Sequence, residues 1–157
     1  MIGKLTIVLG DEVQELNPDA ELKLAEETIN DDLKNQPALY AFYAVLQEAA
    51  DSELADRKLA METMEAVLDE HIRAEALTAG TKVTETMIGS KIRLNEDYQA
   101  SIIALNQAKA QAGKLRAIKE AFVHRKDMLV TLASNMRAQA DPEIFIKKEQ
   151  FRNKQGV

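Results

Sequence analysis

The two histidines are the first residues whose type could do chemistry, because an imidazole ring can bind a metal or transfer a proton. Helical bundles that hold a di-metal centre place a glutamate three residues before each histidine ligand. Here Leu68 stands three residues before His71, and an alanine takes that place before His124. Glu75 lies one helical turn after His71, a spacing that suits two ligands but is more typical of an exposed polar pair. The histidines therefore predict no metal site.

Catalytic and cofactor motifs are the next possibility. The glycines stand singly rather than in a phosphate-binding loop, and no serine lies in a recognisable nucleophile motif. The chain has no cysteine, which excludes disulfides, thiolate metal sites and a cysteine nucleophile. The carboxylate pairs Asp31-Asp32 and Asp69-Glu70 are the only support for a Mg²⁺-dependent nucleotide-processing enzyme. We expect no enzyme and no cofactor.

The sequence contains more residues that could bind phosphate groups than residues that could form a catalytic or metal site. Residues 109–126 carry six Lys and Arg side chains, and Glu120 is the one acidic residue among them. Lys91 and Arg93 extend this basic segment towards the N-terminus. Two interpretations have equal weight: a solvated helix face, or a surface whose contacts with nucleic-acid phosphates weaken as salt rises. Because aromatic residues are scarce in this segment, binding to a single strand should follow the backbone with little sequence preference.

The net charge of −6 hides a division along the chain. Residues 1–80 carry 6 Lys and Arg against 18 Asp and Glu, whereas residues 81–157 carry 14 against 8. Oppositely charged helices could pair within the fold. Alternatively, the basic half could meet a polyanion while the acidic half sets its orientation. The sequence leaves both interpretations open.

A long helix is predicted in the first half of the chain. Pro37 suits a first helical position, residues 38–77 contain neither Gly nor Pro, and Gly80 follows where a C-cap belongs. These limits give one helix of about 40 residues, or about 60 Å. A short helix over residues 82–94 then leads to a second long helix, which Asn95 caps.

The second long helix has an apolar seam, a row of positions three or four residues apart that runs from Tyr98 to Met136. Eleven of its twelve positions are apolar, and Arg125 is the exception. We expect Arg125 to pair with an acidic residue of the first long helix or to reach an interface, because an unpaired buried charge is costly. Two seamed helices joined by a short turn must run antiparallel. The predicted fold class is all-α, a long antiparallel helical hairpin that assembles into an oligomer.

The two chain ends flank this hairpin. The predicted segments are residues 1–36, residues 37–138 and residues 139–157. In the first, residues 4–9 alternate like a β-strand that another subunit could pair with, and an acidic helix runs from Pro18 to about Lys34. The last is a separate basic amphipathic helix that starts at Asp141.

Three aromatic residues, Tyr40, Phe42 and Tyr43, crowd the start of the first long helix on more than one face. One neighbouring helix cannot cover all three, so we expect them to contact other subunits of a homo-oligomer rather than to stack with bases.

Composition indicates a folded cytoplasmic protein. Hydrophobic residues make up 46% and charged residues 29% of the chain, a balance typical of ordered helical proteins. No secretion signal is visible, and the longest apolar run, residues 38–46, is far shorter than the ~20 residues that cross a bilayer. The lack of cysteine also suits a reducing compartment.

Three stretches carry a resemblance to a known family. They are residues 66–69, 82–98 and 121–132, with the sequences AVLD, KVTETMIGSKIRLNEDY and AFVHRKDMLVTL. Their order and spacing resemble the phage recombination mediators of the UvsY type. The likeness covers about two-thirds of the chain, from Pro37 to Ala138. It includes no catalytic signature.

This resemblance implies a small helical protein of the bacterial host cytoplasm that forms closed homo-oligomeric rings and binds single-stranded DNA. Such a protein helps to load a RecA-like recombinase onto strands covered by single-strand-binding protein. The family's basic residues before the Leu-Asp pair are replaced here by Glu65 and Val67, so DNA contact must fall elsewhere. The predicted DNA-binding residues are Arg73, Lys82, Lys91, Arg93, Lys109, Lys114, Arg116, Lys119, Arg125 and Lys126.

A second function fits the same pattern. A coiled-coil assembly or scaffold protein of a phage would also need long seamed helices, and its basic half would then only pair with acidic surfaces. Retention on DNA that falls steeply with salt would favour the mediator, and an absence of DNA binding would favour the assembly protein.

Overall fold

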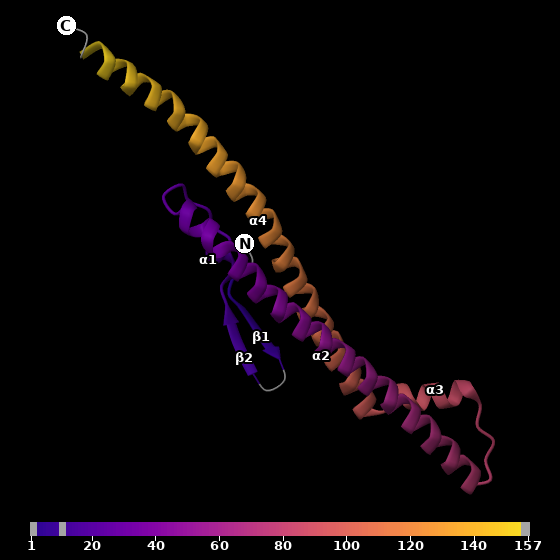
Figure 1. Cartoon of the computed structure of the whole chain (residues 1–157). Helices are drawn as coiled ribbons and strands as arrows, with labels where there is room; N and C mark the ends of the chain where they lie inside the picture. The colour runs from indigo at the N-terminus through magenta and orange to yellow at the C-terminus, as the bar shows by residue number, and fades with distance from the viewer. Residues whose placement is uncertain (1–2, 10–11, 155–157) are drawn as a thin grey trace. The chain divides into compact units, whose positions relative to one another are not determined.

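The computed structural model describes residues 3–9 and 12–154, with the side chains of residues 3–9 and 13–140. Two strands, a short helix and three longer helices follow one another along the chain (Figure 1). Their bounds are β1 Leu5–Leu9, β2 Glu12–Leu16, α1 Pro18–Glu21, α2 Ile29–Thr78, α3 Glu85–Leu94 and α4 Glu96–Lys154. Helices α2 and α4 form the long helical hairpin that the sequence predicts.

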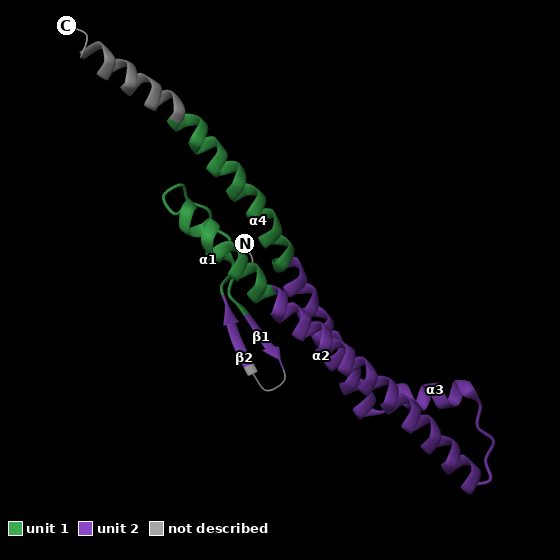
Figure 2. Cartoon of the chain, in the orientation of Figure 1, with its two compact units in different colours: residues 1–5, 17–43, 118–157 green, residues 6–16, 44–117 purple. Residues whose placement is uncertain are grey.

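The chain divides into two compact units, each of which contains a stretch of α2 and a stretch of α4 (Figure 2). Unit 1 comprises Met1–Leu5, Asn17–Tyr43 and Ile118–Val157, and unit 2 comprises Thr6–Leu16 and Ala44–Ala117. The predicted boundaries after residues 36 and 138 both fall inside long helices. The three predicted segments are therefore not the units of the structure.

The antiparallel direction of the hairpin follows from the side-chain pairs within unit 2. Asp51 of α2 lies 3.2 Å from Arg116 of α4, and Glu65, further along α2, lies 3.4 Å from Tyr98, which is earlier on α4. A later residue of α2 therefore contacts an earlier residue of α4, so the two helices run antiparallel.

Helix α2 crosses Pro37, where the sequence predicted a helix start. Proline removes one helical hydrogen bond and its ring strains the preceding turn, so the local rule favours a boundary there. In unit 1, however, Ile29 and Gln36 are buried, and Gln36 Nε2 donates to the carbonyl oxygen of Phe122 at 2.6 Å. Packing outweighs the local preference. The predicted acidic helix to Lys34 is instead the short α1 and, after a turn, the beginning of α2.

Helix α4 also crosses a predicted boundary. It is continuous from Glu96 to Lys154, so the separate helix predicted to start at Asp141 is part of α4. The side chains of the predicted basic amphipathic end lie outside those that the structure describes.

The N-terminal strand has its partner within the chain, because β1 and β2 form a two-stranded sheet. The partner of this strand is therefore β2 of the same chain rather than a strand of another subunit, which the sequence had left possible. In unit 2, Ile7 and Leu16 are buried, and the carboxamide of Gln111 on α4 bonds to the backbone of Val8, accepting from its N–H at 3.0 Å and donating to its carbonyl. This amide satisfies a strand edge that β2 leaves free.

The turn between the long helices is built as the sequence predicts. Gly80 has a φ of +63° just after α2, a conformation that favours glycine at a helix C-terminus. Thr84 Oγ1 accepts from the N–H of Met87 to begin α3, and Asn95 Oδ1 accepts from the N–H of Tyr98 at 2.9 Å to begin α4. The apolar cluster that fixes this end of unit 2 consists of Ile72, Ile88, Ile92 and Tyr98.

The core of unit 1 is aromatic. The ring of Tyr43 on α2 stacks on that of Phe122 on α4, with centroids 4.7 Å apart, and Ile118 and Leu129 are almost fully buried beside the same seam of α4. None of the described helices contains an apolar stretch long enough to cross a bilayer.

Candidate nucleic-acid interface

Arg125 was predicted as a DNA contact, and the structure corrects this prediction. The residue is only 5% exposed, and its guanidinium lies within unit 1. Nη2 is 2.6 Å from Asp32 Oδ1, and Nη1 donates to Gln36 Oε1 at 2.6 Å. Arg125 does pair with an acidic residue of α2, as the second expectation proposed, but this residue is Asp32, which precedes the predicted helix start at Pro37.

Asp32, the acidic partner of Arg125, accepts a hydrogen bond on each of its carboxylate oxygens. Thr28 Oγ1 donates to Asp32 Oδ2 at 2.7 Å. This hydrogen bond, together with the one from Arg125, lowers the pKa of Asp32 below its usual value, against the opposing effect of burial. The carboxylate is therefore charged at neutral pH, as a partner for a buried guanidinium must be.

Arg73 is exposed but already paired with two carboxylates. It lies 2.7 Å from Asp69 on α2 and 2.7 Å from Glu85 at the start of α3. The hydrogen bonds that Arg73 donates to Asp69 and Glu85 raise the pKa of its guanidinium. This arginine links α3 to α2 within unit 2, so a phosphate would have to compete with two carboxylates for it.

Two further predicted cations have one carboxylate partner each. Arg116 lies 3.2 Å from Asp51, and Lys126 lies 3.4 Å from Asp127. The four side chains are exposed or half-buried, and such surface pairs are weak. Arg116 and Lys126 can exchange their partners for a phosphate at little cost.

The remaining six predicted cations form no ion pair with any residue that the structure describes. They are Lys82, Lys91, Arg93, Lys109, Lys114 and Lys119. All are exposed except Lys119, which is half-buried. Lys119 belongs to unit 1 and the other five to unit 2.

The positions of these cations on α3 and α4 determine which of them lie on the same helix face. Lys91 and Arg93 lie in the last turn of α3, where positive charge also complements the helix dipole. Lys109 and Arg116 are seven residues apart on α4, so they share one stripe and are separated by about 10 Å along the helix. Lys114 lies on the other flank of the same stretch of α4. Unit 2 thus carries cations on two helices, without carboxylate partners at most positions.

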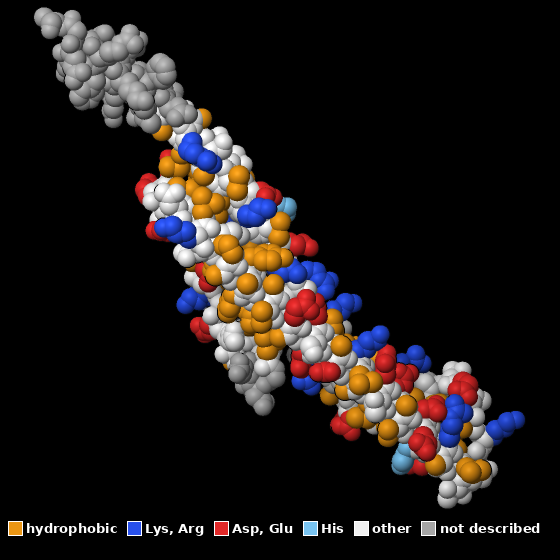
Figure 3. All heavy atoms as spheres, in the orientation of Figure 1, with side chains coloured by type: hydrophobic (Ala, Val, Ile, Leu, Met, Phe, Trp, Pro, Cys, Tyr) orange, Lys and Arg blue, Asp and Glu red, His pale blue; other side chains and the backbone are white. Residues whose placement is uncertain are grey.

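Charges of both signs are interspersed on the face of the molecule shown in Figure 3. Helix α2 contains 11 Asp and Glu against 4 Lys and Arg, and α4 contains 7 against 11. Only Arg116 and Arg125 form ion pairs from α4 to α2 among the described residues. Pairing between the two helices therefore uses only part of the basic segment.

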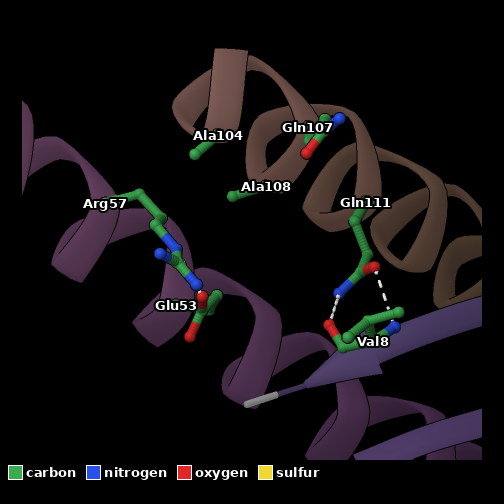
Figure 4. Close-up of a pocket in the computed structure, with 7 residues that line it drawn as sticks. All are labelled: Val8, Glu53, Arg57, Ala104, Gln107, Ala108 and Gln111. Atoms are coloured by element: carbon green, nitrogen blue, oxygen red, sulfur yellow. Dashed lines mark hydrogen bonds and ion pairs between the residues drawn. The ribbon is translucent and has the colours of Figure 1, made fainter. Parts of the chain in front are cut away.

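A mixed polar cavity of about 340 Å³ lies in unit 2 between β1, α2 and α4 (Figure 4). The small side chains of Ala104 and Ala108 leave the space, and the polar wall includes Arg57, whose Nε is 2.6 Å from Glu53. Arg57 was not among the site residues predicted from the sequence. The described lining also includes the carboxamides of Gln107 and Gln111, which can form hydrogen bonds, and it includes no nucleophile beside a base.

His71 and Glu75 lie 3.6 Å apart on the exposed surface of α2. In the part of the chain that the structure describes, no three His, Cys, Asp or Glu side chains come close enough together to hold a metal ion. This arrangement is an exposed polar pair, as the helical spacing indicates.

The three predicted interface aromatics separate into two groups. Tyr40 and Phe42 are 39% and 44% exposed, whereas Tyr43 is fully buried. Burial raises the pKa of the Tyr43 hydroxyl, and the nearby charge of Glu21 adds to the effect. Tyr43 belongs to the core of unit 1 because Phe122 and Phe42 contact both its face and its edge. Its prediction as a subunit contact is therefore corrected.

The geometry leaves a set of exposed, mostly unpaired cations in unit 2 as the strongest candidate site. Comparison of the chain with protein-family models, curated proteins and solved structures found no match.

Proposed function

We propose that this protein is a non-enzymatic recombination mediator that binds single-stranded DNA through exposed cations and helps to load a RecA-like recombinase onto strands covered by single-strand-binding protein. The observation that carries the proposal is the group of unpaired cations of unit 2. It consists of Lys82, Lys91, Arg93, Lys109 and Lys114, with Arg116 beside them on α4.

The chemistry of these side chains suits a phosphate backbone. Lysine and arginine release counterions when they meet phosphates, and this release drives binding that does not depend on sequence. The unpaired cations have no carboxylate to give up before they do so. No aromatic platform accompanies them, so the bases would contribute little. The likeness to UvsY-type mediators supports the step from DNA binding to recombinase loading.

Self-association would multiply a weak contact. A few phosphate contacts per chain give modest affinity, but an oligomer presents the same cations repeatedly to one strand, which raises the effective concentration. Loading of a recombinase also requires a surface that holds a strand while other proteins exchange on it. A homo-oligomer with one cation set per subunit meets both needs.

An assembly protein is the second candidate, and one observation favours it. Arg116 and Arg125 both pair with aspartates of α2, which is the use of the basic half that a purely structural hairpin would make. Under this alternative the unpaired lysines only keep the helices soluble.

The test compares two charge-reversal variants by the fluorescence anisotropy of a labelled oligothymidine. Lys109→Glu combined with Lys114→Glu removes unpaired cations from unit 2, and should weaken binding about tenfold or more because several phosphate contacts are lost. The matched control, Lys34→Glu combined with Lys58→Glu, reverses two exposed lysines of α2 that have carboxylate partners. The control should change binding much less. Equal effects of the two variants would contradict the proposed site.

A second measurement tests the mediator step. Recombinase filament formation on a strand already covered by single-strand-binding protein should be faster in the presence of the wild-type protein than with the Lys109/Lys114 variant. DNA binding without any acceleration would leave a strand-binding protein that is not a mediator.

A further inference from the structure

A second apolar stripe runs along α2 in unit 2, away from its buried seam. Val45, Leu59, Val67 and Leu77 are 67%, 63%, 57% and 83% exposed. Ala49, Ser52 and Ala55 continue the three-or-four spacing from Val45 to Leu59, and Thr63 continues it to Val67, whereas Glu70 and His71 interrupt it before Leu77. This spacing is the pattern of a helix that packs against another helix. At its centre is a shallow apolar recess along Leu59, Ala60, Thr63 and Val67, in which Asp56 is the only charged residue. We call the residues that line this recess, Asp56, Leu59, Ala60, Thr63, Met64 and Val67, the outer seam. A soluble chain seldom leaves such a stripe uncovered.

Unit 1 contains a groove between α2 and α4. Two hollows of about 400 and 450 Å³ share Leu33 and so adjoin. The first also includes Pro37, Tyr40 and Val123, and the second includes Ile29 and Met136. Among the side chains that the structure describes, the charged residues that line this groove are Lys126 and Arg137, and none of the lining residues is a carboxylate.

The two surfaces match in length, polarity and charge. The groove follows α2 from Ile29 to Tyr40, and the outer seam follows α2 from Asp56 to Val67. Both stretches are therefore about 17 Å long at 1.5 Å per residue. Apolar side chains dominate both, and the seam's charge is negative while the groove's charges are positive. A helix laid into a groove between two helices is a common mode of recognition.

We propose that the groove of one copy of this chain receives the outer seam of a second copy. The contact joins two different surfaces, so each added copy still offers one free groove and one free seam. Such a head-to-tail contact propagates, and it forms a ring if the rotation closes or a filament if it does not. The inference deepens the self-association within the proposed function, and it does not depend on DNA binding.

Light scattering of the full-length protein without DNA tests this contact. The groove variant Val123→Glu and the seam variant Leu59→Lys each change an exposed side chain, so both should fold, as circular dichroism would check. Each variant alone should be monomeric, because a charge facing an apolar surface weakens the contact about tenfold or more. A one-to-one mixture should form a heterodimer and nothing larger, because one intact groove and one intact seam remain.

The matched control is Ile103→Lys, which changes another exposed apolar side chain of unit 2 that lies in neither surface. It should assemble like the wild type. A second seam variant, Val67→Lys, should behave like Leu59→Lys. A monomeric wild type at about 100 μM, normal assembly of the groove and seam variants, or a mixture that stays monomeric would each overturn the proposal.

The two proposals fail separately. If the mixture gives the heterodimer but the wild type does not bind oligothymidine, the docking contact stands and the mediator function falls. If the wild type binds oligothymidine but its assembly ignores Leu59→Lys and Val123→Glu, only the docking contact is wrong.

Discussion

Two arginines of α4 pair with aspartates of α2, one in each unit, and they differ in what surrounds them. In unit 1, Arg125 and Asp32 are 2.6 Å apart with side chains 3% and 22% exposed. In unit 2, Arg116 and Asp51 are 3.2 Å apart with side chains 57% and 29% exposed. The same pairing is therefore an internal link in one unit and a surface contact in the other. Burial, rather than the choice of residues, decides which arginine remains available to a partner.

The two stretches of α4 therefore differ in how they hold α2 and in how many of their cations remain exposed. In unit 1, Arg125 of α4 holds α2 because its guanidinium pairs with Asp32 and donates to the amide oxygen of Gln36. The unit 2 stretch holds α2 through one weaker surface pair, Arg116 with Asp51, and contributes Tyr98 to the apolar cluster that includes Ile88. Its cations are left for solvent or for a polyanion.

The largest effect is expected for Arg125→Leu. Removal of the guanidinium leaves Asp32 and Gln36 without their partner, so the free energy of unfolding should fall by about 3 kcal/mol, at the lower end for a broken buried pair because water reaches Asp32. The paired control Arg116→Leu should cost less than about 1 kcal/mol. Urea denaturation measures both. Equal losses would show that the two pairs do not differ as described, and Asp32→Leu combined with Arg125→Leu should recover part of the loss.

Ile88→Ala tests whether the apolar cluster of unit 2 stabilises that unit. Ile88 is 2% exposed in the apolar cluster of unit 2, and truncation should cost about 2–3 kcal/mol because a cavity is left. Protection of the α3 amides in hydrogen exchange should fall with it. A loss below about 1 kcal/mol would mean that the cluster is not what stabilises this end of unit 2.

Acid should weaken unit 1 through Asp32. The pKa of this carboxyl is lowered from its usual 3.8 in the folded chain. Its contribution is therefore complete above that value and is lost as the pH falls through the lower folded pKa. The difference in unfolding free energy between the wild type and Asp32→Asn should shrink from about pH 5 to about pH 2. A difference that stays constant over this range would contradict the role given to Asp32.

The smallest effect is expected for Gln111→Ala. Its amide makes two bonds to the backbone of Val8, so the change should cost about 1 kcal/mol and should mainly raise hydrogen exchange at the Val8 amide. Unchanged exchange would show that β1 does not need this amide. The variant Gln107→Ala is a suitable control because Gln107 is also on α4 but makes no such bond.

The sequence predicted the parts of this fold that local chemistry decides. The cap residues Gly80 and Asn95 lie where predicted, and the seam of α4 is buried with Arg125 paired to an acidic residue. The continuation of α2 through Pro37 was missed, because it depends on a contact between Gln36 and Phe122, 86 residues apart.

The predicted site was less complete, since fractional burial cannot be read from residue type. Arg125 was predicted as a DNA contact, although its place in the apolar seam also predicted a pair, and Tyr43 was predicted as a subunit contact; both lie in the core. The pairing of Arg73 with Glu85 depends on the position of α3. Arg57, which lines the cavity of unit 2, was not proposed at all. Its four-residue spacing from Glu53 was the available signal.

The most direct test of the central claim is the salt dependence of binding between the wild-type protein and a single-stranded oligonucleotide. We expect measurable binding at low salt and a linear fall of log affinity with log salt concentration, with a slope of about 0.7 for each phosphate contacted. Three to five contacts per chain would give a slope of about −2 to −4. No binding at low salt, or binding that does not change with salt, would contradict the account.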